Sequence, residues 1–258
     1  MAINVDISHR VQTITLNRPE ALNAFTNDMY LAVGEILEKA AEDDAISVVI
    51  LTGAGRAFCA GTDLNQMADT SRQQDDYVAH FPYFIKQFAF FPKPLLAAVN
   101  GLGIGIGLTL LPHCDMVYMA SNARLRAPFV PLGLTVEAGN SYLLPKAIGW
   151  AQASELLYTG RWIEASEAQA MGLAYRISDP EDLLEEVTAK AREIAAMPLV
   201  SLMTTKRLLV SHKETGFESA VQAETQAFAQ LTDAPANREA IAAFMEKREP
   251  DFGSLMND

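Results

Sequence analysis

Residues 94–108, PLLAAVNGLGIGIGL, join an apolar run to four glycines placed at every second position. The run PLLAAV is typical of a strand buried on both faces, because it lacks the polar alternation of a half-exposed strand. The glycines leave the backbone bare, so that another segment or a ligand can approach its N–H groups closely. Three interpretations compete for this loop: a phosphate loop, one face of a membrane helix, or a buried turn beside a substrate.

The first two interpretations are the weaker ones. A dinucleotide-binding loop requires the spacing G-x-G-x-x-G, which the four glycines never form, and the lysine of a P-loop is missing. Residues 94–112 contain the GxxxG spacing of membrane helix pairs, but the glycines and the prolines at both ends make a poor helix. We therefore expect a buried turn that leads into a short helix at about 106–112 and presents its free N–H groups.

A second loop of the same kind, GAGRAFCAGTDL (53–64), follows the β-branched run SVVILT (47–52). Gly61 allows a tight turn, and Asp63 is a candidate N-cap for the residues after it. Each loop alone would be an ordinary connection between a strand and a helix. At the ends of successive buried strands, however, the two loops can aim one N–H each at a single oxygen. Such an oxyanion hole stabilises a thioester enolate or a tetrahedral intermediate.

The rest of the pattern alternates strands with helices and then becomes helical. We expect a hairpin turning at Ser8–Arg10, a helix capped by Thr26, a helix at about 71–91, and strands at 115–120 and 124–129. From Glu137 onward the spacing is helical, apart from a short strand at 173–178. This order predicts an α/β core followed by a helical C-terminal region.

Composition narrows the classes of function. The 258 residues carry a net charge of −12, so the overall field repels nucleic acid and anionic membrane surfaces. Cys59 and Cys114 are the only cysteines and form no CxxC, which argues against a disulfide framework or a zinc site. The alternating, charged N-terminus does not resemble a signal peptide. We expect a reduced, cytoplasmic protein that binds neither nucleic acid nor membrane.

Glu137 is the strongest catalytic candidate. It is the only charged residue in APFVPLGLTVEAGNSYLLP (127–145). A carboxylate in apolar surroundings has a raised pKa and can take up a proton near neutral pH. A glutamate in the first turn of a helix, favoured by the helix dipole, explains the residue equally well. GNSYL lacks the last glycine of a G-x-S-x-G elbow, and the His113–Cys114–Asp115 cluster is more typical of a structural helix end.

Several motifs in a fixed order resemble the crotonase (enoyl-CoA hydratase/isomerase) superfamily. They are LNRPEALNAF (16–25), TGAGRAFCAGTDL (52–64), KPLLAAVNG (93–101), TGRWIEASEAQAMGL (159–173) and AFMEKREPDF (243–252). The resemblance implies a spiral of ββα units over residues 1–198 and a helical region at 199–258 that forms homotrimers or hexamers. It also implies acyl-CoA substrates and no metal or redox cofactor, since coenzyme A enters as part of the substrate.

The resemblance also implies roles for individual residues. The two oxyanion N–H groups fall on Thr62 and on Ile106, where the family commonly has glycine. An isoleucine there must point away from the substrate or narrow its pocket. The positions that bind the substrate and its CoA are Arg18, Asn23, Ala24, Ala60, Asp63, Leu64 and Asn65, with Phe228, Phe244 and Lys247 reaching a neighbouring subunit's CoA.

The acid and base positions distinguish the reactions of the superfamily. Its hydratases use two glutamates, which fall here on Thr109 and Phe129, so ordinary hydration is disfavoured. Glu137, in PFVPLGLTVEAG (128–139), resembles the single carboxylate of the Δ3,Δ2-enoyl-CoA isomerase branch. We expect the chain to convert 3-enoyl-CoA to 2-trans-enoyl-CoA. The alternatives are hydration by an atypical site, thioester hydrolysis, and a catalytically silent acyl-CoA-binding protein.

Overall fold

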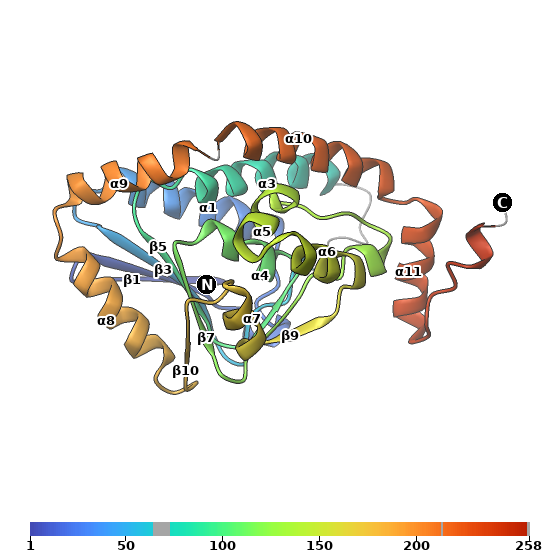
Figure 1. Cartoon of the computed structure of the whole chain (residues 1–258), viewed down its shortest axis with the longest axis horizontal. Coiled ribbons are helices and arrows are strands. Elements are labelled where there is room, and N and C mark those ends of the chain that lie inside the picture. The colour runs from blue at the N-terminus through green and yellow to red at the C-terminus, as the bar shows by residue number, and fades with distance from the viewer. Residues whose placement is uncertain (64–72, 213, 257–258) are drawn as a thin grey trace.

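The computed structural model describes residues 1–63, 73–212 and 214–256, with the backbone alone for 73–79 and 256 (Figure 1). The strands are β1 (Ile3–Ser8), β2 (Val11–Leu16), β3 (Val48–Gly53), β4 (Ala57–Cys59), β5 (Leu95–Val99), β6 (Leu102–Ile104), β7 (Met116–Ala120), β8 (Arg124–Arg126), β9 (Trp162–Glu164) and β10 (Arg176–Ser178). The α-helices are α1 (Asn27–Glu42), α3 (Gln73–Ala89), α4 (Ile106–Thr109), α5 (Asn140–Ile148), α6 (Trp150–Thr159), α7 (Ala165–Met171), α8 (Leu183–Ala195), α9 (Leu199–Ser211), α10 (Glu214–Leu231) and α11 (Pro235–Glu246). Short 3-10 turns are η1 (Pro19–Ala21), η2 (Leu111–His113), η3 (Val130–Leu132) and η4 (Ser254–Met256).

The strands form two sheets. The larger sheet has the order β1-β2-β3-β5-β7-β10, and the smaller has the order β4-β6-β8-β9. Each of the pairs β3–β4, β5–β6 and β7–β8 places its first strand in the larger sheet and its second in the smaller one. The neighbours made by this repetition run parallel, whereas the β1–β2 hairpin and the β8–β9 pair are antiparallel. The chain therefore climbs as a spiral, and the expectation of an α/β core is confirmed.

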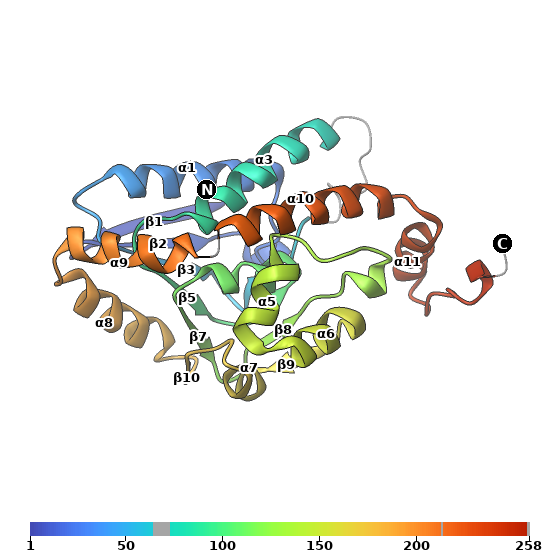
Figure 2. The ribbon, with the colours of Figure 1, turned by 45° about the horizontal axis from the view of Figure 1, so that its top comes forward.

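The helices cover this spiral and extend beyond it. Helix α8 packs across β2, β3, β5, β7 and β10, so it covers one face of the larger sheet, while α1 packs along α3. Helix α10 packs against α5, and Figure 2 shows it between α5 and α3. Helix α11 and the C-terminus lie at one end of the molecule (Figure 1). The C-terminal region is helical as expected, and its role in assembly stays a prediction.

Some elements match their sequence signals closely. The hairpin turns at His9 and Arg10, which both have left-handed φ angles, of 52° and 63°, as a tight turn between twisted strands requires. The hydroxyl of Thr26 caps α1 by accepting a hydrogen bond from the Met29 N–H at 3.3 Å. Residues 94–112 divide into β5, β6, α4 and η2, so the membrane interpretation of this stretch is wrong. Of the helices described, none alone is long and apolar enough to cross a membrane; only the pair α8–α9, bent by 106°, meets that test together.

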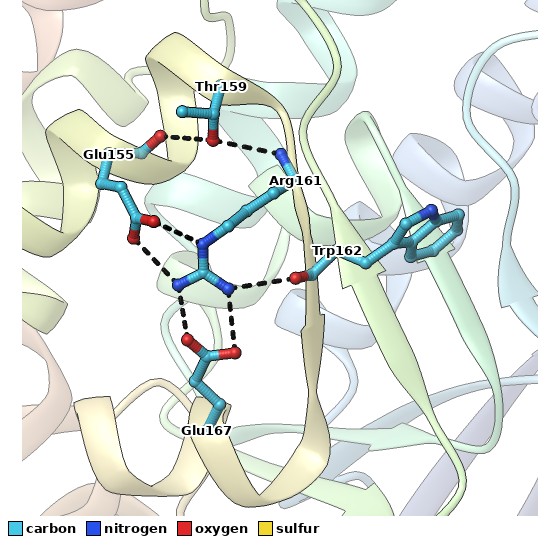
Figure 3. A network of polar contacts seen from close by, with 5 residues as sticks. All are labelled: Glu155, Thr159, Arg161, Trp162 and Glu167. Atoms are coloured by element: carbon cyan, nitrogen blue, oxygen red, sulfur yellow. Dashed lines mark hydrogen bonds and ion pairs between the residues drawn. The ribbon is translucent and has the colours of Figure 1, made fainter.

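Three strands of the smaller sheet lie where the sequence predicted loops or helix. Strands β4, β6 and β9 have three residues each, and β6 contains a glycine. A strand this short shows no alternation in the sequence, and it exists because its neighbours supply hydrogen-bond partners. Next to β9, Arg161 ties α6 to α7 by pairing with Glu155 and Glu167 (Figure 3). These contacts hold the pKa of both glutamates below their ordinary values.

Candidate active site

The glycines in residues 101–107 allow this loop to touch the loop formed by residues 56–61. A Cβ on Gly107 would lie 2.4 Å from the carbonyl oxygen of Cys59, and one on Gly101 would lie 2.2 Å from that of Arg56. A Cβ on Gly105 would meet the Cα of Gly61 at 3.8 Å. Residues 101–107 therefore run against residues 56–61 with no room for side chains at the first and last of these glycines. The interpretation of this stretch as a buried turn is confirmed.

Thr62 lies at the end of the first of these loops. It forms a parallel bridge with Phe25, in which the Phe25 N–H bonds to Gly61 O and the Asp63 N–H bonds to Phe25 O, both at 2.8 Å. In a parallel bridge the central residue turns its own N–H and C=O to the opposite side. The N–H of Thr62 therefore points away from Phe25. The side chain of Thr62 is held separately, by a 2.8 Å hydrogen bond between its hydroxyl and that of Tyr30.

Ile106 is the first residue of α4. Gly105 precedes it with φ 55° and ψ −117°, a conformation that is essentially restricted to glycine. The hydrogen bonds of this turn begin at Leu108 and Thr109, whose N–H groups both bond to Gly105 O. The side chain of Ile106 is 1% exposed and belongs to the hydrophobic core. The isoleucine is thus accommodated by packing, and its N–H lies at a helix N-terminus.

Glu137 lies in the loop between η3 and α5 and is 7% exposed. Side-chain hydrogen bonds hold the backbone around this loop. The Nε2–H of His113 donates to Ala138 O at 2.9 Å, and the Asn140 amide donates to Glu137 O at 3.2 Å and to Thr109 O at 2.8 Å. The last of these bonds joins the Glu137 loop directly to α4. Ala138 has a left-handed φ of 61°, a strained conformation for alanine that these contacts maintain.

The charge of Glu137 reaches the Thr62 loop. The pKa of the Cys59 thiol is raised to about 12, mainly because the thiol is buried and also because of the negative charge of Glu137, while a hydrogen bond with Gly61 acts in the opposite direction. Cys59 stands three residues before Thr62. The buried carboxylate of Glu137 is therefore close enough to the loop that ends at Thr62 for its charge to act on that loop.

The residues expected to bind CoA meet at a junction of two loops. Arg18 donates to Ala24 O at 2.7 Å and forms a 2.9 Å ion pair with Asp63, while the Ala60 N–H bonds to Leu22 O at 3.0 Å. The Asn23 side chain is fully buried, accepts from the Arg18 N–H and donates to the carbonyl oxygens of Ala54 and Ala57. Its side chain is therefore committed to holding the loops, and any contact with CoA would come from its backbone.

Asp63 takes part in this junction and is paired with Arg18. The residues that it was expected to cap, together with the predicted substrate-binding residues Leu64 and Asn65, lie outside the described residues.

A model of the enoyl-CoA hydratase/isomerase family matches residues 6–255. The chain belongs to this family.

Individual relatives and a solved structure support the same family assignment. The chain is 35% identical over 248 residues to the 1,2-epoxyphenylacetyl-CoA isomerase of Escherichia coli strain K12, covering 94% of each protein. It is 36% identical over 250 residues to the 2,3-dehydroadipyl-CoA hydratase of the same strain, covering 96% of the chain and 97% of the relative. An enoyl-CoA hydratase/isomerase from Pseudoalteromonas atlantica T6c superposes with a TM-score of 0.92 at 37% identity, covering 98% of this chain and 100% of that one. The crotonase fold is confirmed, and the chain is an enzyme of this superfamily that acts on acyl-CoA.

The three residues expected to reach a second CoA in this family member lie on the C-terminal helices. Phe228 on α10 packs against the hydrophobic core, whereas Phe244 on α11 is 60% exposed. Lys247 ends α11 with a left-handed φ of 56° and is exposed. Helix α11 is joined to the loop before Glu137, because Asn237 donates to Leu132 O at 2.7 Å. In the described part of the chain, no three His, Cys, Asp or Glu side chains gather as a metal site would require.

Sequence reasoning missed the residues that hold the site together. Tyr30, Asn140 and Glu224 all bind the loops that carry the candidate groups. Asn140 follows Glu137 closely, so its position in the sequence was a usable signal. Tyr30 and Glu224 lie 32 and 85 residues from their partners and give no signal in the sequence.

Proposed function

We propose that this enzyme is an enoyl-CoA isomerase, which moves a double bond from 3-enoyl-CoA to 2-trans-enoyl-CoA. The observation that carries the proposal is the placement of Glu137. It is buried, its loop is bonded to α4, and its charge acts on Cys59 beside the Thr62 loop. A general base must lie within reach of the proton that it removes, and we expect this carboxylate to face the two candidate oxyanion donors.

The proposed reaction uses Glu137 twice. Its carboxylate removes a proton from C2 of the 3-enoyl thioester, and the electron pair of the broken C–H bond delocalises into a dienolate. The N–H groups of Thr62 and Ile106 stabilise the negative oxygen of the thioester. The protonated Glu137 then delivers its proton to C4, which leaves the double bond between C2 and C3. The atoms balance without any metal or redox cofactor. Loss of one of the two oxyanion donors typically lowers kcat by about 10²–10³-fold.

The surroundings of Glu137 support proton transfer over addition of water. Thr109 and Phe129, at the positions of the two hydratase glutamates, are 0% and 7% exposed. The Thr109 hydroxyl donates to Gly105 O at 3.3 Å, so it turns back onto its own helix. Neither side chain can exchange a proton as a carboxylate does.

Hydration is the second candidate, because several relatives carry that name. They include the 2,3-dehydroadipyl-CoA hydratase of Escherichia coli and a probable enoyl-CoA hydratase of Rhizobium meliloti, which is 34% identical to this chain. One relative of similar identity is named an isomerase, although of an epoxide. The shared fold and CoA site account for resemblance to either group, so the choice depends on the acid and base positions.

The deciding experiment compares two substrates and two variants. Purified protein is incubated separately with a 3-enoyl-CoA and a 2-enoyl-CoA, and the products are identified by mass and by double-bond position. We expect isomerisation by the wild type, its loss in Glu137→Gln, and normal activity in Glu218→Gln, which changes an exposed glutamate on α10. Full activity of Glu137→Gln would refute the proposed base. Efficient formation of 3-hydroxyacyl-CoA from the 2-enoyl substrate would establish the hydratase instead.

A homotrimer or a hexamer is part of the proposal. Val200, Leu208 and Leu209 of α9 are 77%, 60% and 68% exposed, and Phe244 and Met245 of α11 are 60% and 75% exposed. We expect the two groups of exposed apolar side chains to lie in subunit interfaces, which commonly cover such surfaces. Sedimentation equilibrium measures the assembly directly, and a monomer at micromolar concentration would contradict this part of the proposal.

A further inference from the structure

Glu224 is a buried carboxylate that the proposed chemistry does not use. It lies on α10, is 6% exposed, and accepts two backbone hydrogen bonds from the start of α5. The Gly139 N–H reaches one carboxylate oxygen at 2.6 Å, and the Ser141 N–H reaches the other at 2.7 Å. Burial raises the pKa of Glu224, whereas its bonds with Ser141 and Gly139 act in the opposite direction.

These bonds cap a helix with a residue from a different helix. The first N–H groups of an α-helix have no hydrogen-bond partner within the helix. A side chain that directly precedes the helix in the sequence usually supplies one. Gly139, the N-cap of α5, makes no side-chain cap of its own. Glu224 takes this place from a position 85 residues further along the chain. A carboxylate suits it, because the helix dipole and two N–H donors both stabilise a negative charge there.

The capped backbone is the backbone that carries the proposed base. Gly139 and Ser141 follow Glu137 by two and four residues. Between them and Glu137 stands Ala138, which needs outside contacts to keep its φ of 61°. Helix α10 makes a second contact here, because the buried ring of Phe217 fills the space where a Cβ on Gly139 would lie, only 2.2 Å away.

We infer that Glu224 is a positioning residue, which fixes the Glu137 loop through the Gly139 and Ser141 N–H groups and so sets the placement of the base. The inference rests on the proposed function of Glu137. It also gives α10 a part in the active site of its own subunit, beyond the predicted roles of the C-terminal region in assembly and in CoA binding.

Glu224→Gln tests the geometry with little change in volume. The amide has one acceptor oxygen, and its NH₂ group faces the second N–H donor, so one of the two bonds is lost. A hydrogen bond to a charged group contributes about 1.5–3 kcal/mol, which corresponds to roughly 10–100-fold in an equilibrium. We expect hydrogen exchange at the Gly139 and Ser141 amides to accelerate by about 10-fold or more, relative to wild type and to the matched control Glu218→Gln.

The kinetic readout separates positioning from general stability. We expect kcat with 3-enoyl-CoA to fall by about 10-fold or more while KM changes by less than about twofold, because a small displacement of a base affects the chemical step. In a Glu137→Gln background, Glu224→Gln should lower the residual rate no further, because its effect passes through Glu137. If Glu224→Gln does not fold, Glu224→Asp, which retracts the carboxylate by one methylene, is measured in the same way.

The outcomes distinguish this inference from the proposed function. Unchanged exchange at the two amides, or an equal loss of rate with and without Glu137, would overturn the positioning role and leave the isomerase proposal intact. Accelerated exchange in Glu224→Gln together with full activity of Glu137→Gln would overturn the proposed base, and with it the inference. Accelerated exchange, lower kcat and no further loss in the double variant support both.

Discussion

Replacing Gly107 by alanine should separate the two loops that carry Thr62 and Ile106. The added Cβ would lie 2.4 Å from the carbonyl oxygen of Cys59 and 3.2 Å from its Cβ, whereas ordinary contact begins at 3.4 Å. The obstacle is backbone, which cannot rotate away as a flexible side chain can. Helix α4 must therefore move away from residues 59–62 by about 1 Å.

A displacement of this size is enough to remove a hydrogen bond. An N–H···O bond of about 2.9 Å that lengthens by ~1 Å falls outside bonding distance. If the substrate oxygen stays with one loop, it loses the donor on the other, which typically costs about 10²–10³-fold in kcat. Overpacking also destabilises the fold, by about 1–3 kcal/mol, so that activity must be expressed per folded molecule.

Gly149→Ala is the matched control, because it introduces strain without a collision. Gly149 has a φ of 86° and a ψ of 154°, a conformation essentially restricted to glycine, and nothing within 4 Å of its added Cβ, so the substitution costs about 1–3 kcal/mol through the backbone alone. The assay measures kcat and KM at a temperature where circular dichroism shows both variants to be folded. We expect a loss of about 100-fold in kcat for Gly107→Ala and a nearly normal kcat for Gly149→Ala. Normal kcat in Gly107→Ala would refute the reasoning that the spacing of the loops sets the rate.

Three further substitutions or treatments test other contacts. Tyr30→Phe removes the 2.8 Å bond to the Thr62 hydroxyl, and we expect kcat to fall by roughly 2–13-fold, the worth of one hydrogen bond; equal activity would show that this bond does not place the Thr62 N–H. The thiol of Cys59 has a pKa of about 12 and is fully buried. Because the thiolate is the reactive form, we expect it to react with a disulfide reagent at pH 8 only after unfolding in urea. Rapid reaction in the native protein would contradict its burial. Lys206→Met leaves the exposed Asp115 without its 2.6 Å ion pair. Because this carboxylate stays solvated, urea unfolding should show a loss of only about 1 kcal/mol; a more stable variant would mean that desolvation of the lysine outweighs the pairing.

The sequence predicted the parts of the fold that have a strong period. Helix α1, the buried strands β3 and β5, and the C-terminal helices all have runs long enough for their spacing to be informative. Three of the four strands of the smaller sheet were missed, because strands of three residues show no alternation. Their pairing depends on segments far away in the chain, as β9 pairs with β8 across 36 residues at Arg126 and Trp162.

In the candidate site, too, some residues could be predicted from the sequence and others could not. Groups that would touch the substrate lie in short motifs, so Glu137, Thr62 and Ile106 could be selected from the sequence. The residues that hold those groups could not, because each acts across a long separation. Glu224 has no motif around it, and it reaches the Gly139 N–H only because α10 packs on α5.

The resemblance implies catalytic carboxylates at three positions of the family, of which only Glu137 carries one in this chain, and Thr109 stands at another. The Thr109 carbonyl accepts the 2.8 Å hydrogen bond from Asn140, so it joins α4 to the loop of Glu137. A hydratase needs two groups that share a water molecule and exchange protons with it. A single base that removes a proton at C2 and returns it at C4 needs instead to stay at one distance from both carbons and from the oxyanion donors. His113 and Asn140 hold the loop of Glu137 rigidly, and we infer the same of Glu224. We expect such rigidity to favour proton return by the same carboxylate over attack by water.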